Sequence, residues 1–237
     1  MSIFQLKNVN FKNILHYPDI QISSGKTTFI SGESGAGKST LLKLLNGILS
    51  PTSGEIFYQG KNIDEYNQIA LRREVLLVGQ SSFLFNSTIK ENFREYYTYR
   101  NLANISDEQI NYFLKMCAID FPLDTACETM SGGEQQRVFT AINLSFSSKV
   151  LMLDEPLSAL DEKNANALMK NIKNHCAEHE KTLIVISHDK AIVEKYADEI
   201  INIKPPKSPS RGTCLTAKKA GASSSPPEGE LEGADYE

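Results

Sequence analysis

A glycine-rich stretch that contains a lysine and several hydroxyl residues gives this chain its clearest capacity for chemistry. The stretch fits the pattern G-x-x-x-x-G-K-[S/T], in which bare backbone N–H groups form a nest for phosphate, the lysine reaches the β- and γ-phosphates, and the serine hydroxyl holds Mg²⁺. A β-branched and aromatic run, Thr27–Ile30, enters it and a helical pattern, Leu41–Gly47, leaves it, which predicts a nucleotide triphosphate on a helix N-terminus. The residues expected to hold the nucleotide are Gly32, Glu33, Ser34, Gly35, Ala36, Gly37, Lys38, Ser39 and Thr40.

Two carboxylates follow a second apolar run, Val150–Leu153, which is typical of a buried parallel strand. Ligands of such sheets bind at the carboxyl ends of the strands, so the two acids are expected near the phosphates. Asp154 is expected in the Mg²⁺ shell, and Glu155 is expected to polarise the attacking water. Alone, an Asp-Glu pair at a strand end would be interpreted as a surface turn; beside a phosphate loop it indicates hydrolysis.

A third stretch, Met130–Arg137, has the sequence Met-Ser-Gly-Gly-Glu-Gln-Gln-Arg. Its core matches the signature of ATP-binding cassette (ABC) ATPases, and the resemblance to that family extends from Ile3 to Ile203. The resemblance implies that Ser131, Gly132 and Gly133 contact ATP held by an opposite subunit. Two copies of the chain would then close head-to-tail over two nucleotides, as a homodimer in the ATP-bound state.

Three further segments resemble the family in the expected order. Gln80 follows an apolar run, as the family's Q-loop glutamine does, and the resemblance implies contacts with Mg²⁺ and the attacking water. The segment from Ser158 to Asp161 matches the D-loop, which places Asp161 among the nucleotide-binding residues, and His188 matches the histidine that hydrogen-bonds the γ-phosphate. One departure concerns the aromatic residue that stacks on adenine in the family, for which Phe11 and Tyr17 are both candidates.

Strand patterns alternate with helical patterns along most of the chain, which predicts a doubly wound sheet. We expect an α/β P-loop NTPase fold with a RecA-like, mainly parallel sheet, an antiparallel β subdomain that includes an edge strand at Ile3–Phe11, and an α-helical insertion. The ABC ATPase domain is expected at residues 1–204, with the helical subdomain at about 81–135. Residues 205–237 are rich in Pro, Ser, Ala and Gly and are expected to form a disordered tail, foreign to the domain in one interpretation.

The net charge, the cysteine spacing and the distribution of apolar residues indicate the kind of partner and the compartment. The net charge is −4, which argues against nucleic acid, and the four cysteines are widely spaced, as in reduced cytosolic proteins. The chain has neither a secretory leader pattern nor an apolar run of bilayer length. We therefore expect a cytoplasmic subunit held at the inner face of the cell membrane by a transmembrane permease, with ATP and Mg²⁺ as cofactors.

The family powers transporters, DNA-repair machines and translation machines, and the sequence favours a transporter. A repair relative would insert a long coiled coil between Gln80 and Ser131, and a translation relative would carry two cassettes. The segment from Gln80 to Asn92 resembles a pattern of exporter-like cassettes, most similar to stand-alone cassettes of bacterial iron-efflux (Fet-type) transporters, while an importer of a small solute stays open. Five aromatic residues are interpreted either as a groove for the permease or as the core of the helical insertion: Phe83, Phe85, Phe93, Tyr96 and Tyr97.

A histidine pair offers a separate possibility. His175 and His179 are spaced i, i+4 on a helical pattern, a spacing that can bind a metal ion. The favoured interpretation is a polar, solvated helix end without metal.

Overall fold

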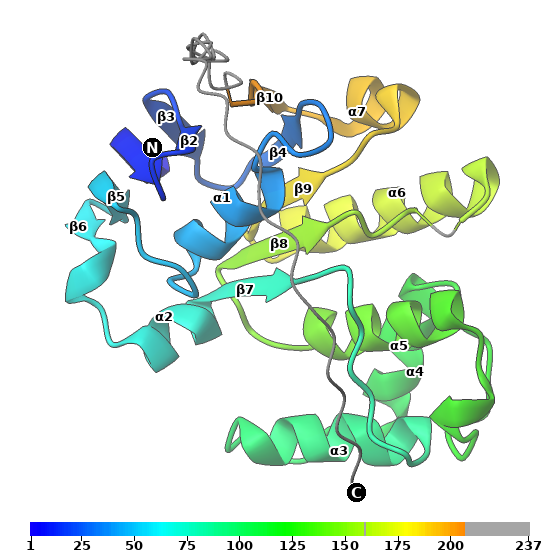
Figure 1. Ribbon diagram of the computed structural model, residues 1–237. Helices are drawn as coiled ribbons and strands as arrows, with labels where there is room; N and C mark the ends of the chain where they lie inside the picture. The colour runs from blue at the N-terminus through cyan, green and yellow to red at the C-terminus, as the bar shows by residue number, and fades with distance from the viewer. Residues whose placement is uncertain (159, 207–237) are drawn as a thin grey trace, which may run out of the picture. The chain divides into compact units, whose positions relative to one another are not determined.

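The computed structural model describes residues 1–158 and 160–206, which form two β-sheets and the helices packed on them (Figure 1). Of the expected tail, residues 207–237 lie outside the described residues. Pro205 and Pro206 belong to the same compact unit as the rest of the domain, Met1–Pro206.

One of the two sheets is a five-stranded parallel sheet in the order β10-β4-β9-β8-β7. Every neighbouring pair in it is parallel. Because the strands run the same way, all their carboxyl ends lie along one edge. The strands are β4 (Thr27–Ser31), β7 (Val75–Val78), β8 (Val150–Asp154), β9 (Thr182–Ile186) and β10 (Glu199–Asn202).

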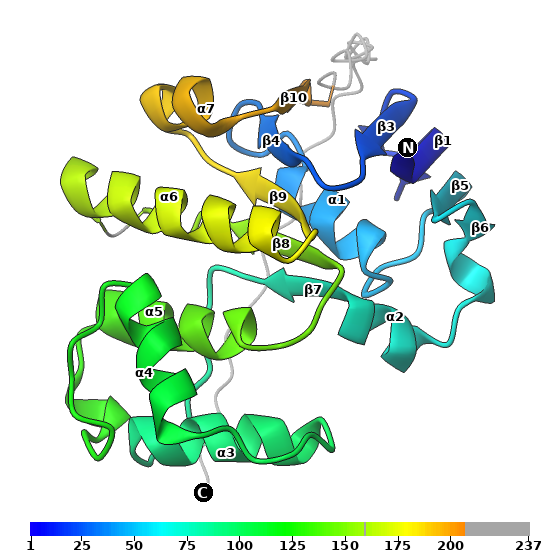
Figure 2. The same cartoon turned by 180° about the vertical axis from the view of Figure 1, so that it is seen from behind.

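Both faces of this sheet are apolar, because alternate side chains of a strand point to opposite faces. Val150 and Met152 belong to one buried cluster, together with helix α1 (Lys38–Leu45) and the antiparallel sheet. Leu151 and Leu153 belong to the other, together with α5 (Gly132–Leu144), α6 (Glu162–Glu178) and α7 (Lys190–Tyr196). Figures 1 and 2 show α1 and α6 on opposite sides of the sheet, which confirms the doubly wound expectation.

The second sheet is antiparallel, and here one prediction was wrong. Strand β1 (Ser2–Phe11) is central rather than an edge, because it pairs with β5 on one side and with β2 and β3 on the other. Its alternating pattern showed one buried face but carried no information about how many strands flank it. The neighbouring strands are β2 (Leu15–His16), β3 (Ile20–Ser23), β5 (Ser53–Tyr58) and β6 (Lys61–Asn62).

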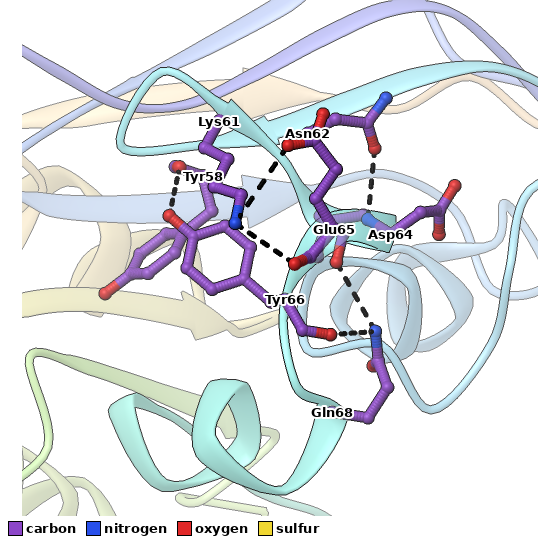
Figure 3. A network of polar contacts seen from close by, with 8 residues as sticks. Tyr58, Lys61, Asn62, Asp64, Glu65, Tyr66 and Gln68 are labelled. Carbon is purple, nitrogen blue, oxygen red and sulfur yellow. Dashed lines mark hydrogen bonds and ion pairs between the residues drawn. The ribbon is translucent and has the colours of Figure 1, made fainter.

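A short polar network joins β5 of this sheet to the segment that follows β6 (Figure 3). The Tyr66 hydroxyl donates to the Tyr58 carbonyl at 2.9 Å, and the Gln68 amide donates to the carbonyls of Ile63 and Tyr66. These bonds hold the 3₁₀ turn η1 (Ile63–Glu65) and helix α2 (Gln68–Glu74), which leads directly into β7. The sequence analysis had assigned neither α2 nor α7.

The stretch expected to form the helical subdomain, about 81–135, contains α3 (Ile89–Tyr99), α4 (Asp107–Met116), the 3₁₀ turn η2 (Cys127–Thr129) and the first turn of α5. Both views place these helices together beyond β7 (Figures 1 and 2). Three of them begin with a capping box, in which the first hydroxyl and an acidic or amide side chain three residues later satisfy each other's backbone N–H. The capping hydroxyls belong to Thr88, Ser106 and Ser131.

Candidate nucleotide site

The residues predicted to handle phosphate gather at the carboxyl edge of the parallel sheet. The phosphate loop follows β4, Gln80 follows β7, Glu155 follows β8 and His188 follows β9. These strands are neighbours in space although they are far apart in the chain. They border a cavity of about 450 Å³, whose lining is Phe11, Lys12, Ile14, Leu15, Ser34, Gly35, Gly37, Lys38, Ser39, Thr40, Gln80, Glu155, His188 and Pro206.

The phosphate loop ends at a helix whose first turn has no side-chain cap. Gly37 precedes α1 with a φ of 93°, in the left-handed region that glycine favours. A Cβ at this position would lie 2.8 Å from the Leu15 side chain and 2.9 Å from the Tyr17 hydroxyl. That hydroxyl donates a hydrogen bond to the Gly37 carbonyl at 2.8 Å, which holds the end of the loop in place. The first N–H groups of α1 therefore remain available to an anion.

Lys38 is held inside the loop rather than in an ion pair. Its side chain is 5% exposed, and its ammonium donates to the carbonyls of Gly32 and Glu33, both at 2.9 Å. Those carbonyls carry no net charge, so the positive charge of Lys38 is not neutralised by a carboxylate there. This places one net positive charge at the uncapped start of α1, where a phosphate chain would bind.

Within the described part of the chain, Asp154 has a buried carboxylate oxygen without a hydrogen-bond partner, which a metal ion could coordinate. The residue is 6% exposed, and its buried Oδ1 atom has no hydrogen-bond partner among the described residues. Burial raises the pKa of the carboxyl, against the opposing influence of the Ser39 hydroxyl. A hard cation with oxygen ligands would satisfy Oδ1 and favour the charged carboxylate, so the residues present fit Mg²⁺.

Glu155 and His188 form a polar pair across two strand ends. The His188 Nε2 atom lies 3.1 Å from Glu155 Oε1, with both side chains reaching solvent. Glu155 adopts a φ of 54°, a left-handed conformation that costs a non-glycine residue free energy, and its backbone N–H donates to the Ile186 carbonyl at 3.1 Å. No sequence signal marked this backbone conformation, because it arises where β8 meets the end of β9.

The candidates for adenine stacking separate in the structure. Phe11 lines the cavity together with Lys12, Ile14 and Leu15, whereas Tyr17 is 4% exposed and lies beneath the phosphate loop. Burial raises the pKa of the Tyr17 hydroxyl, which keeps it a neutral hydrogen-bond donor. Phe11 therefore remains the aromatic candidate, and Tyr17 supports the loop.

The signature residues lie elsewhere. Ser131, Gly132 and Gly133 are absent from the lining of the nucleotide cavity, and Ser131 and Gly132 are exposed. The Ser131 hydroxyl donates to Glu134 at 2.7 Å, and this bond lowers the pKa of the Glu134 carboxyl. Asp161 caps α6 by accepting from the Asn164 N–H at 3.0 Å, while Ala159 of the same D-loop lies outside the described residues.

Comparison with known proteins decides the family. A family model described as "ABC transporter" matches residues 15–158 of the chain. The chain belongs to this family. It is an ATP-binding and ATP-hydrolysing ABC transporter subunit, which confirms the expectations for fold class and enzyme activity.

Particular relatives of this ABC ATPase include both stand-alone and fused cassettes. It is 31% identical over 207 residues to the probable iron export ATP-binding protein FetA of Escherichia coli K12, covering 86% of this chain and 92% of that protein. It is 36% identical to an ATP-dependent lipid A-core flippase of Pectobacterium atrosepticum, covering 87% of this chain but 35% of the flippase. The structure of cbiO1 from Clostridium perfringens, part of the complex cbiONQ, superposes with a TM-score of 0.73 at 30% identity, covering 86% and 85% of the two chains.

Two structural findings bear on partners and cofactors. Within residues 1–158 and 160–206, no helix combines the length and the apolar character needed to cross a bilayer. The same described residues contain no cluster of three or more His, Cys, Asp or Glu suited to a metal ion.

Proposed function

We propose that this ABC ATPase binds Mg·ATP in the cavity at the carboxyl edge of the parallel sheet and drives an exporter. The single observation that carries the nucleotide assignment is that Lys38, Gln80, Glu155 and His188, which come from four separate parts of the chain, line one cavity. Their placement around the uncapped start of α1 supports phosphate binding on physical grounds.

Each polar group of the cavity has a role in this proposal. The N–H groups of Gly35 and Gly37 and the Lys38 ammonium bind the phosphates. Ser39, Gln80 and Asp154 would hold Mg²⁺, which when bound neutralises charge on the phosphate oxygens.

Glu155 orients a water for in-line attack on the γ-phosphorus, while the bond to ADP breaks and inorganic phosphate leaves. His188, held 3.1 Å from Glu155, donates to a γ-phosphate oxygen as its charge develops.

The exposed signature residues supply the argument for a second copy. Ser131 begins α5 as part of a capping box, yet it borders no part of the cavity in its own chain. A helix N-terminus exposed beside two glycines is suited to phosphate held by another molecule. The homodimer in the ATP-bound state follows from this arrangement, and each copy would complete the other's site.

The helical region offers a surface for the permease. The five aromatic residues do not share one environment: Phe93 is fully buried, and the Tyr97 hydroxyl bonds inward to the Ser145 carbonyl. In contrast, Phe83 is 62% exposed and packs edge-on against Phe85, whose ring lies 5.9 Å from that of Tyr99. We propose that the exposed Phe83 and Tyr99, together with the partly buried Phe85 and Tyr96, contact a permease at the membrane.

The direction and the substrate rest on the relatives. FetA is a probable iron export protein of nearly the same extent as this chain, and the flippase is a second exporting relative. These likenesses support export, with metal efflux as the substrate hypothesis. In this proposal the transported metal ion would bind to the permease.

The experiment uses the full chain with Glu155→Gln, which keeps the shape of the side chain and removes its charge. The variant should bind ATP, hydrolyse it at least about 10²-fold more slowly and form a dimer. Purification from host membranes with ATP, followed by mass spectrometry, should recover a multi-span membrane protein. Recovery of soluble ribosomal or DNA-processing proteins alone would overturn the transporter proposal.

A matched pair of variants tests the docking surface. Phe83→Ser should weaken recovery of the membrane protein without changing ATP turnover of the isolated chain. Tyr112→Ser removes an aromatic side chain of α4 that is 50% exposed and should leave recovery unchanged. Equal effects of the two substitutions would contradict the assignment of the surface.

A further inference from the structure

A second cavity lies at the amino edge of the parallel sheet, away from the strand ends that carry the nucleotide site. It measures about 550 Å³ and borders Lys149, which precedes β8, and Lys181, which precedes β9. The remaining wall comes from α3, α4, α6, the end of α5 and the segment after it. Its lining is Tyr97, Gln109, Phe113, Leu144, Ser145, Phe146, Ser147, Ser148, Lys149, His175, His179, Glu180 and Lys181.

Two lysines line this cavity, and one of them has no carboxylate partner among the described residues. Lys149 pairs with Glu74 at 2.9 Å, but Lys181 forms no ion pair with any carboxylate of the described residues. Its ammonium donates to the Phe146 carbonyl at 3.0 Å, and burial lowers its pKa. The single carboxylate in the lining is the exposed Glu180. A half-buried ammonium without a counter-ion is a group that a bound anion would stabilise.

Two buried polar side chains in the same wall also lack partners. His175 is 4% exposed and Ser148 is 5% exposed. The two ring nitrogens of His175 have no hydrogen-bond partner among the described residues, and the Ser148 hydroxyl has none either. Leaving such buried groups unsatisfied destabilises the folded state. This finding also corrects the interpretation of His175 as part of a solvated helix end, because its ring packs edge-on against Phe113 at 5.7 Å.

The exposed His179 covers His175. Its ring lies 4.3 Å from the His175 ring, and its Nδ1 atom lies 2.9 Å from the His175 carbonyl oxygen. His175 already borders the cavity, and rotation of this one exposed side chain would uncover more of its imidazole ring. The adjacent Lys181 ammonium disfavours a metal ion at this histidine pair, since its positive charge would repel the ion.

We propose that this cavity binds a small molecule through a phosphate group, which accepts hydrogen bonds from Lys181, Ser148 and, once His179 turns aside, the N–H of His175. A phosphate group fits because it offers several strong acceptor oxygens to donors that arrive from three different segments. The volume exceeds that of inorganic phosphate and leaves room for the rest of a small metabolite beside Tyr97, Phe113 and Phe146. The site is separate from the proposed ATP site, since the two linings share no residue.

Imidazole NMR of the full chain tests this proposal with inorganic phosphate as the probe. The chain has four histidines, so each signal can be assigned with single His→Gln variants. Burial and the Lys181 charge lower the pKa of His175 to about 4. Saturable phosphate binding should shift the His175 and His179 signals and raise the pKa of His175. Phosphate bound at the nucleotide site would instead shift His188.

The pKa comparison must account for every charged or titratable group that lines the two cavities flanking His175. Those groups are Lys149, His179, Glu180, Lys181 and Tyr97 on one side, and Tyr112, Lys115 and Glu178 on the other. Lys181→Met should weaken phosphate binding at least tenfold, whereas Lys115→Met, which removes the lysine of the neighbouring cavity, should not change it. Ser148→Ala offers a second variant with little effect on packing, and it should also weaken binding.

Three results would overturn the proposal. One is the absence of a saturable shift at His175, and another is an equal shift with sodium chloride at the same ionic strength. The third is an unchanged phosphate affinity in both Lys181→Met and Ser148→Ala. Shifts of His175 and His179 produced by Zn²⁺ but not by phosphate would identify a cation site instead.

Discussion

Two helices of this ABC ATPase begin beside glycines, and they begin in different ways. Helix α1 follows Gly37 and has no side-chain cap, whereas α5 follows Ser131 and opens with a full capping box. The start of α1 lies in a cavity with a buried lysine, while Ser131 is exposed and borders no cavity of the nucleotide site.

The start of α1 belongs to a phosphate site whose residues all come from one chain. The start of α5 is instead an exposed surface that would contact the phosphate of a second chain. At α1 the unsatisfied N–H groups and the Lys38 ammonium can both bind phosphate, so nucleotide binding needs no second copy of the chain. At α5 the capping box fixes the conformation of the helix start, but the phosphate would have to belong to a nucleotide bound by another copy of the chain. Variants at the two helix starts should therefore affect different steps, namely nucleotide binding and subunit pairing.

Lys38→Ala should have the largest effect. It removes the charge held by the carbonyls of Gly32 and Glu33, and ATP turnover should fall by a factor on the order of 10³. Phosphate release measures the rate, and nucleotide affinity measured by calorimetry should fall as well. Lys43→Ala, in the last turn of the same helix, is the matched control and should keep near-normal turnover. Near-normal turnover of Lys38→Ala would contradict the assignment of the start of α1 as the phosphate site.

Ser131→Ala should have an intermediate effect. Loss of the cap costs about 1 kcal/mol of helix stability, and ATP turnover should fall by about tenfold because the start of α5 no longer meets the opposite nucleotide in one conformation. ATP affinity of the monomer should not change, and light scattering should show weaker ATP-dependent dimerisation.

Ser106→Ala is the control for Ser131→Ala, because Ser106 caps α4 with the same kind of box. It should cost similar stability and leave turnover unchanged. If both serine variants lowered turnover equally, the effect would be one of folding, and the role proposed for α5 in pairing would be lost.

Tyr17→Phe should have the smallest effect. The substitution removes the hydroxyl that donates to the Gly37 carbonyl at 2.8 Å and keeps the buried ring. The free energy of unfolding should fall by about 1 kcal/mol, and ATP affinity should fall only a few-fold. Urea unfolding and calorimetry measure these quantities. A loss of turnover as large as that of Lys38→Ala would show that the loop support, rather than the lysine charge, dominates the site.

Much of the local structure was predictable, because its determinants are close together in the chain. The apolar runs that form β7 and β8 were expected from the sequence and are confirmed. The motif residues that line the nucleotide cavity were also expected, although their roles stay predictions. Short helices such as α2 were missed because their burial depends on the neighbouring sheet.

The sequence by itself determined the family and the chemistry available to it, because a phosphate loop, a signature and a strand-end acid are recognisable within a few residues each. The tertiary structure decided which of these residues meet. The strand order β4-β9-β8-β7 brings His188 and Glu155 to within 3.1 Å of each other. Contacts between distant segments also made β1 central and buried both Tyr17 and His175. Periodicity reports which face of an element is apolar, but what covers that face depends on the rest of the chain.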